Sequence, residues 1–305
     1  MKRALAGLVA VTAAAALTAC GGGADPLSTP STTGGAPAPA GTITVGSANF
    51  PESTLLAEIY ALALEDKGVT VTRKLNIGSR ETYYPGLQDG SIDLIPEYTG
   101  VLLTHLGDTT GATESEEVYT ALKSALPPEL VVLEKSAAEN KDAVVVTRAT
   151  ATERGLKSIA DLAKSDDVVF GGPPEFQKRA DGIPGLEDKY GLKIKEYKAL
   201  DVGGPLTVDA LKSGVVIAAD LFTTDPAITA NDFVVLEDPE ANFAAQNVVP
   251  LITKAKATPE VTEVLNAISA KLTTETLIEL NGKLNAPDKP DAAKVAREWL
   301  TSVGL

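Results

Sequence analysis

The feature that most constrains the fold is an internal repeat, because residues 87–99 and 211–223 share one pattern. In each segment a helix ends at Leu-x-x-Gly, a buried strand follows, and an aromatic residue with a threonine after it comes eleven residues after the leucine. Gly90 and Gly214 lie just past their helices, where a left-handed cap residue is expected. The repeat predicts two similar lobes. Since helix–glycine–strand units are common in α/β proteins, the alternative is a chance match.

Each repeat ends in a pair of residues that indicates function. Tyr98-Thr99 and Phe222-Thr223 fall just beyond the carboxyl ends of the strands predicted at residues 92–95 and 215–219. Open α/β sheets bind their ligands at that edge. The two pairs therefore predict one ligand cleft, with an aromatic residue on each lobe.

Helical and β-rich stretches alternate along the rest of the chain. Residues 54–67 carry apolar side chains at the i, i+3, i+4 and i+7 spacing of a helix with one buried face. Further helices are predicted at 81–87, 113–126, 158–163, 206–213, 258–272, 274–284 and 291–303, and further strands at 42–45, 69–75, 143–147, 168–170 and 233–236. Strands separated by helices predict an α/β fold with mainly parallel sheets.

Residues 1–20 resemble a bacterial lipoprotein signal peptide. A short basic start precedes an apolar run at residues 4–17, which is too short to span a bilayer and ends in Leu17-Thr18-Ala19-Cys20. In a lipobox of this kind the cysteine is lipidated and begins the mature chain. We therefore expect Cys20 to anchor the protein to the cell membrane on its extracytoplasmic face, the alternative being an ordinary signal peptide with an incidental cysteine.

Composition excludes several classes of protein. Residues 21–41 are rich in Gly, Pro, Ser, Thr and Ala and are predicted to be a flexible tether. A net charge of −14 argues against nucleic acid as a partner. Cys20 and His105 are the only Cys and His of the sequence, too few for a zinc site or for most nucleophile systems. We expect a monomer with no metal, no cofactor and no enzymatic activity. The alternative is a two-carboxylate hydrolase, since the chain is rich in Asp and Glu.

Several motifs resemble one family. Residues 45–53 (VGSANFPES) are similar to the opening GSKNFTES segment of substrate-binding proteins for osmoprotectant ABC importers, which take up glycine betaine, choline, carnitine or proline betaine. Residues 76–81 (NIGSRE), 90–100 (GSIDLIPEYTG), 175–186 and 220–225 (DLFTTD) continue the resemblance, which covers about residues 43–303. The chain looks closest to the actinobacterial ProX-like lipoproteins.

The resemblance implies a two-lobed periplasmic-binding-protein fold of type II. Each lobe would be a mainly parallel sheet flanked by helices, with the ligand cleft between the lobes. The chain would cross between lobes near Glu139–Asp142 and Asp238–Asn242. Lobe I would comprise residues 42–140 and 243–305, and lobe II residues 141–242. The implied partners are a small-molecule ligand and an ABC permease in the membrane.

The resemblance also implies a binding site. In this family a cage of tyrosines holds a quaternary ammonium group by cation–π contact. Tyr98 matches the cage tyrosine of the first lobe, and Phe222 stands where a second-lobe tyrosine usually stands. Arg179 matches an arginine that pairs with a ligand carboxylate, and Asn140 matches a polar residue near the crossover. The resemblance also places Ser47, Asn49, Arg80, Thr99 and Thr223 in the site. Two further candidates are Glu81, as a charge for a cation, and Tyr83, as a substitute for a missing aromatic wall.

Three departures from the family weaken the identification of the ligand. Asp142 occupies the place of another cage tyrosine, Gln246 or Asn247 that of a fourth, and Ala48 stands where members carry Lys or Gln. The alternatives are therefore a ligand without a quaternary ammonium group, or a sensor or surface lipoprotein without transport. For Arg179 the alternative is a surface salt bridge with Asp181 or Glu175, and for Tyr83 it is ordinary packing.

Overall fold

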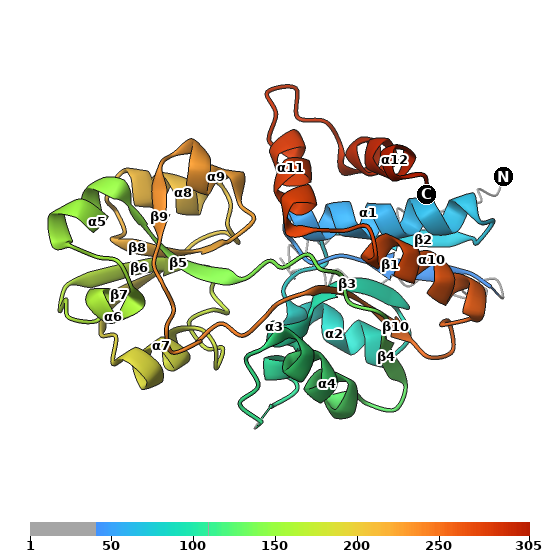
Figure 1. Cartoon of the computed structure of the whole chain (residues 1–305), viewed down its shortest axis with the longest axis horizontal. Helices are drawn as coiled ribbons and strands as arrows, with labels where there is room; N and C mark the ends of the chain where they lie inside the picture. The colour runs from blue at the N-terminus through green and yellow to red at the C-terminus, as the bar shows by residue number, and fades with distance from the viewer. Residues whose placement is uncertain (1–40, 109) are drawn as a thin grey trace, which may run out of the picture.

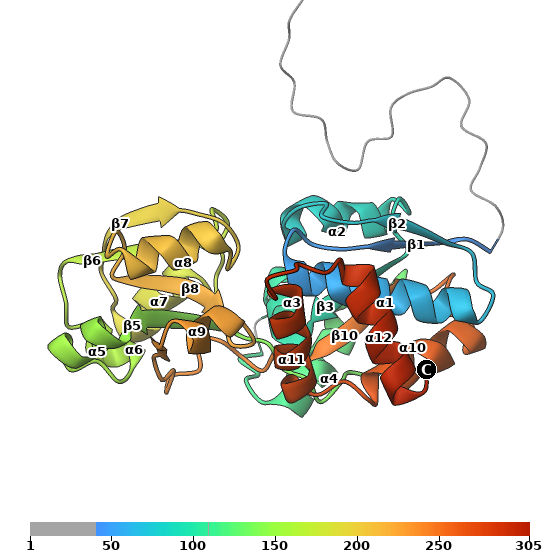
Figure 2. The same ribbon diagram turned by 90° about the horizontal axis from the view of Figure 1, so that it is seen from above.

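The computed structural model describes residues 41–108 and 110–305, so the predicted signal peptide, Cys20 and nearly all of the tether lie outside it. In the described residues the strands form two sheets, each flanked by helices (Figure 1). We call the first sheet with its helices lobe I and the second lobe II. The two lobes lie side by side when seen from above (Figure 2). The predicted two-lobed α/β fold is confirmed.

Lobe I contains the beginning and the end of the described chain. Its sheet has the order β2 (Val71–Lys74), β1 (Ile43–Gly46), β3 (Leu94–Tyr98), β10 (Val248–Thr253) and β4 (Leu130–Val132). Its helices are α1 (Pro51–Asp66), α2 (Arg80–Gln88), α3 (Thr99–His105), α4 (Ser115–Ala125), α10 (Pro259–Ser269), α11 (Thr274–Leu284) and α12 (Ala292–Val303).

Lobe II is formed by the middle of the chain. Its sheet has the order β7 (Ile194–Ala199), β6 (Val168–Gly172), β8 (Ala218–Phe222), β5 (Asp142–Thr147) and β9 (Phe233–Val235). Its helices are α5 (Arg148–Arg154), α6 (Ile159–Leu162), α7 (Ile183–Tyr190), α8 (Pro205–Lys212) and α9 (Pro226–Ala230). None of the helices that the structure describes is long and apolar enough to cross a membrane.

One strand in each sheet runs against the other strands. β10 pairs antiparallel with β3 and β4, and β5 pairs antiparallel with β8 and β9, whereas the remaining pairs are parallel. Four of the eight strand pairs are antiparallel, so both sheets are mixed, whereas mainly parallel sheets were predicted. Each reversed strand is the first one after a crossing between the sheets, since β5 follows residues 133–141 and β10 follows residues 236–247. These two linkers run side by side, and the Asn140 amide donates to the Gln246 carbonyl.

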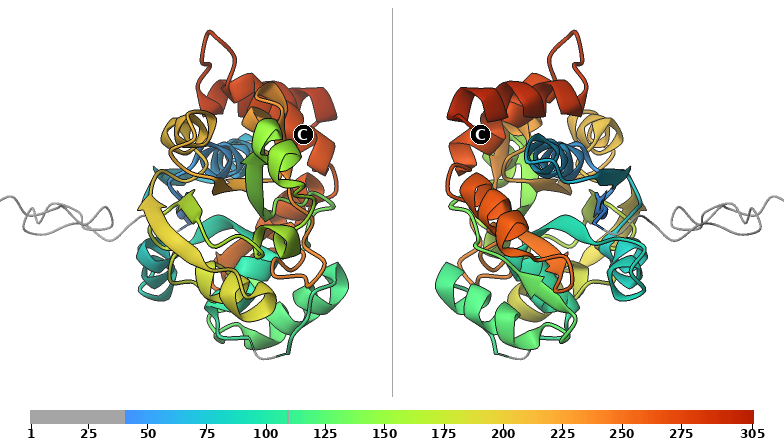
Figure 3. Two further views of the ribbon diagram at one scale, coloured as in Figure 1. Left: turned by 90° about the vertical axis from the view of Figure 1, so that its left-hand side faces the viewer. Right: turned by 90° about the vertical axis from the view of Figure 1, so that its right-hand side faces the viewer.

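Helix α1 is central to the core of lobe I. Leu55, Leu56, Ile59 and Leu64 are fully buried and pack with side chains of the sheet and of α10–α12. The end-on views show these orange and red C-terminal helices beside the blue α1 (Figure 3). A buried side chain of this kind contributes about 1.5–3 kcal/mol. The packing holds the amino end of α1, which begins at Pro51, against the boundary with lobe II.

The internal repeat has the same backbone geometry in both lobes. Gly90 and Gly214 adopt left-handed conformations, with φ of 78° and 73°, as predicted for helix caps. After each cap the chain forms a hydrogen bond back to the preceding helix. The Ile92 amide donates to the Gly86 carbonyl, and the Val216 amide donates to the Ala210 carbonyl. Strand pairing consequently begins later than predicted. The aromatic residues are therefore the last residues of β3 and β8, and do not lie beyond them.

Gly214→Ala should separate backbone strain from packing, because the position where the new Cβ would lie is open. We expect the free energy of unfolding to fall by about 1–2 kcal/mol, the cost of a left-handed conformation in a residue with a side chain. Gly282→Ala, in the interior of α11 and with equal space, is the control and should be neutral or stabilising. Urea unfolding measures the free energy of unfolding of both variants. If both change equally, the left-handed backbone of residue 214 is not a source of strain.

Candidate ligand-binding site

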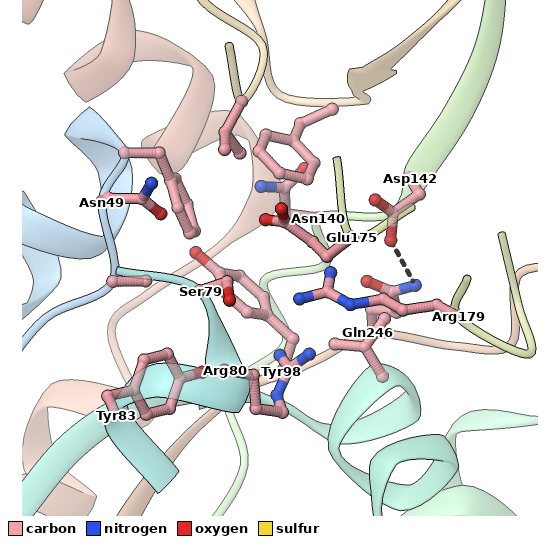
Figure 4. Close-up of a pocket in the computed structure, with 15 residues that line it drawn as sticks. Asn49, Ser79, Arg80, Tyr83, Tyr98, Asn140, Asp142, Glu175, Arg179 and Gln246 are labelled. Carbon is pink, nitrogen blue, oxygen red and sulfur yellow. Dashed lines mark hydrogen bonds between the residues drawn. The ribbon is translucent and has the colours of Figure 1, made fainter. Parts of the chain in front are cut away.

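A small cavity lies between the lobes at the ends of β3 and β8 (Figure 4). Its volume is about 50 Å³, which is room for a few water molecules. Both lobes and both linkers contribute to its wall. The lining residues are Ala48, Asn49, Phe50, Ser79, Arg80, Tyr83, Tyr98 and Val101 of lobe I, Asp142, Glu175, Arg179, Val202 and Phe222 of lobe II, and Asn140 and Gln246 of the linkers.

Three aromatic rings from the two lobes meet at this cavity. The centroid of Phe50, the residue before α1, lies 5.1 Å from that of Phe222 and 6.1 Å from that of Tyr98. The Tyr98 hydroxyl donates to Glu52 at 2.7 Å. We call Phe50, Tyr98 and Phe222 the aromatic wall. Aromatic faces attract a cation that has no N–H to donate.

A buried ion pair forms the lobe I side of the cavity. Arg80 donates to both carboxylate oxygens of Glu97 at 2.8 Å, and the Tyr83 hydroxyl donates to the same carboxylate at 2.6 Å. Burial alone would raise the pKa of Glu97, but the Arg80 charge and these hydrogen bonds outweigh it and hold the pKa below its usual range. Arg80 and Tyr83, predicted to bind ligand, thus line the cavity while bonding Glu97.

A second ion pair crosses between the lobes. Arg179 of lobe II donates to both carboxylate oxygens of Glu81 of lobe I, each at 3.0 Å. Partial burial raises the pKa of Glu81, but the hydrogen bond and charge of Arg179 outweigh it and lower the pKa to about 2. Figure 4 shows Arg179 reaching toward the middle of the cavity. The guanidinium that was predicted to hold a ligand carboxylate is thus paired with a carboxylate of the protein.

Lobe II carries several buried carboxylates, of which Asp142 lines the cavity. Asp142 lies at the start of β5 and accepts a hydrogen bond from Gln246 at 3.3 Å. Burial raises the pKa of Asp142 and of Asp220 on β8. Burial, together with the charge of Asp142, also raises the pKa of Asp181 to about 6. Buried carboxylates with raised pKa values are stabilised by a nearby cation or N–H donor.

The structure brings some of the predicted ligand-binding residues together at the cavity and leaves others away from it. Those at the cavity are Asn49, Arg80, Tyr83, Tyr98, Asn140, Asp142, Arg179, Phe222 and Gln246. Glu81 does not line the cavity itself but bonds Arg179, which does. Sequence reasoning missed Phe50, Ser79 and Glu175 as lining residues, although all three lie inside motifs that carry the family resemblance, and it missed Val101 of α3. It also missed Val202, which precedes α8 and for which the sequence gives no signal.

Ser47, Thr99, Thr223 and Asn247, also predicted to bind ligand, do not line the cavity. The Thr99 hydroxyl donates to the Ala245 carbonyl, and the side chain of Asn247 donates to the Ser136 carbonyl. The hydroxyls of Ser47 and Thr223 accept from backbone amides. All four side chains are therefore hydrogen-bonded to backbone groups. Of the two alternatives in the second linker, Gln246 lines the cavity and Asn247 does not.

Two lobes joined by paired linkers, with an aromatic and charged cavity between them, define a solute-binding protein of the periplasmic-binding-protein type. Residues 41–302 match the family described as the substrate binding domain of ABC-type glycine betaine transport systems. The chain belongs to this family. Its members bind solutes for ABC transporters.

Known relatives agree with this assignment. The chain is 27% identical to the glycine betaine-binding protein YehZ of Escherichia coli, over 86% of this chain and 90% of the relative. It is also 27% identical to an ergothioneine transport permease/ergothioneine binding protein, EgtU, of Helicobacter pylori, over 83% of this chain and 46% of the relative. The crystal structure of a glycine betaine/carnitine/choline ABC transporter has the same fold, with a TM-score of 0.66, 24% identity, and 85% and 98% of the two chains covered.

Glu97→Gln should strongly destabilise the protein, because it leaves the buried Arg80 guanidinium without a charged partner. We expect the free energy of unfolding to fall by roughly 3–5 kcal/mol. Asp232→Asn is the matched control, since the Arg148–Asp232 pair lies on the surface and its loss should cause no measurable change. Chemical denaturation tests both variants, and a Glu97→Gln protein as stable as wild type would contradict the importance of the pair.

Proposed function

We propose that this chain captures a small quaternary-ammonium zwitterion of the glycine betaine type between its lobes and delivers it to an ABC permease. The observation that carries the proposal is the aromatic wall, because Phe222 of lobe II stands 5.1 Å from Phe50 of lobe I. A methylated ammonium group on these rings would contact both lobes at once. Ligand binding and lobe closure would then be one event.

The location and assembly of the protein are part of the proposal. Lipidated Cys20, outside the described residues, would hold the protein on the extracytoplasmic face of the membrane, with residues 21–41 as the tether. The lobes would comprise residues 42–140 with 243–305, and 141–242. The protein would act as a monomer and release its ligand chemically unchanged. This arrangement keeps the binding domain close to a permease in the same membrane.

A second candidate ligand is a larger zwitterion that also carries N–H donors, such as ergothioneine. The observation that favours it is Asp142, which stands in the place of a cage tyrosine and is buried at the cavity. A buried carboxylate accepts a hydrogen bond from an N–H donor, which a trimethylammonium group lacks. The relative from Helicobacter pylori is named for this ligand.

Calorimetric titration with glycine betaine, choline, carnitine and ergothioneine tests the proposal. We expect saturable binding of at least one of them, and Phe50→Leu should weaken it about tenfold because a π face is lost. Phe233→Leu, which removes a buried ring of β9 that does not line the cavity, is the control and should leave the affinity unchanged. If none of the four compounds binds at millimolar concentration, the proposed ligand class is wrong.

Glu81→Gln should change ligand selectivity, because Glu81 competes with a ligand carboxylate for Arg179. We expect the affinity for glycine betaine to rise roughly tenfold relative to that for choline, which has no carboxylate. An effect of the substitution on lobe closure changes both affinities by the same factor, so it does not change their ratio. Glu65→Gln is the matched control, since it removes another bidentate arginine pair, with Arg73, away from the cavity. An unchanged ratio in the Glu81 variant would show that Arg179 does not meet the ligand carboxylate.

A further inference from the structure

Glu52 is a buried carboxylate that the sequence did not single out. It is the second residue of α1 and only 4% exposed. In the described part of the chain four neutral groups donate to it. Its Oε1 accepts from the Tyr98 hydroxyl at 2.7 Å and from Asn140 Nδ2 at 2.8 Å, and its Oε2 accepts from the Thr224 hydroxyl at 2.6 Å and from Asn281 Nδ2 at 2.5 Å. The partial positive charge at the amino end of α1 also stabilises the Glu52 carboxylate.

The four donors come from distant parts of the chain. Tyr98 ends β3 and Asn281 lies on α11, so both belong to lobe I. Asn140 belongs to the first linker, and Thr224 follows β8 of lobe II. One carboxylate thus joins both lobes and a linker. A group that only capped α1 would need none of these long-range partners.

Glu52 fixes one end of a ring in the aromatic wall. The Tyr98 backbone amide donates to Glu97 at 3.0 Å, and the Tyr98 hydroxyl donates to Glu52 at the opposite end of the side chain. With both ends bonded, the ring has little freedom to turn. Glu52 does not line this cavity, although it lines a larger pocket beside it that shares Phe50 and Phe222. Its influence on a ligand would therefore pass through Tyr98.

Glu52 also holds lobe II through Thr224. Asn281 donates to the Thr224 carbonyl at 3.3 Å, and Asn140 accepts from the Thr224 amide at 3.3 Å. Thr224 is thus surrounded by the groups that also bond Glu52. Any movement of lobe II away from α1 has to separate Thr224 from Glu52, which would leave a buried carboxylate oxygen with one donor fewer.

We propose that Glu52 is a positioning residue that couples the orientation of Tyr98 to the docking of lobe II. In the closed protein its carboxylate holds the ring in the aromatic wall and receives Thr224 at the same time. This inference rests on the proposed function, because it assumes that the aromatic wall holds the ligand. Glu52 contributes to affinity without touching the ligand.

A double-mutant cycle measured with glycine betaine tests the coupling to Tyr98. Tyr98→Phe keeps the ring and removes only the hydroxyl, while Glu52→Gln keeps the shape and places an amide donor against other donors. We expect each variant to bind about tenfold more weakly, and the double variant to bind no more weakly than the singles. Independent losses, which multiply to about a hundredfold, would overturn the proposal. So would unchanged affinity in Tyr98→Phe.

Tyr119→Phe is the matched control for loss of a buried hydroxyl. Its hydroxyl donates to the Leu133 carbonyl at 2.7 Å, away from the cavity. It should leave the affinity unchanged. If Glu52→Gln does not fold, Thr224→Val replaces it in the cycle, because it removes a single donor to the same carboxylate and nearly preserves side-chain volume. The same non-additivity with Tyr98→Phe is expected.

Small-angle X-ray scattering of the unliganded protein tests the docking of lobe II without any ligand. We expect Thr224→Val and Glu52→Gln to increase the radius of gyration relative to wild type, and Tyr119→Phe to leave it unchanged. Scattering identical to wild type in the Thr224 and Glu52 variants would overturn the proposal. If wild-type protein binds no quaternary-ammonium compound, the proposed function fails, and the scattering alone then decides the role of Glu52.

Discussion

The burial of Glu97 determines how lobe I presents its side of the cleft. This carboxylate is fully buried on β3, and Arg80 and Tyr83 of α2 both bond it. A buried charge without a partner costs several kcal/mol, so α2 has to dock at the carboxyl end of β3. The same carboxylate accepts from the Tyr98 amide, which places the Tyr98 ring at the cavity with its hydroxyl on Glu52.

The two sides of the cleft differ in charge. On lobe I the arginine and glutamate of the buried pair neutralise each other. On lobe II, Asp142 and Asp220 are buried carboxylates whose pKa values are raised, and Arg179 is held by Glu81 of the other lobe. Of these, Asp142 lines the cavity beside the aromatic wall, where its carboxylate accepts from Gln246.

Much of the fold could be predicted from local patterns, and the failures have physical causes. The helices with clear apolar periodicity form near their predicted bounds. The strands of the repeat were placed too early, because hydrogen bonds such as that from the Ile92 amide to Gly86 delay pairing after the glycine cap. β10 was not predicted because Pro250 interrupts its run of apolar residues, and a proline argues against a central strand. Its pairing with β3 depends on residues far away in the sequence.

The sequence by itself determined the two-lobed fold, the family and the aromatic residue at the end of each repeated strand, because periodicity, caps and motifs are local properties. Only the tertiary structure decided which polar groups have partners. The Tyr98 hydroxyl bonds Glu52, 46 residues away, and Arg179 bonds Glu81, 98 residues away. Such pairs depend on how helices and lobes pack together. A local pattern therefore indicates that Arg179 lies at the cleft, but not that a carboxylate of the protein already holds it.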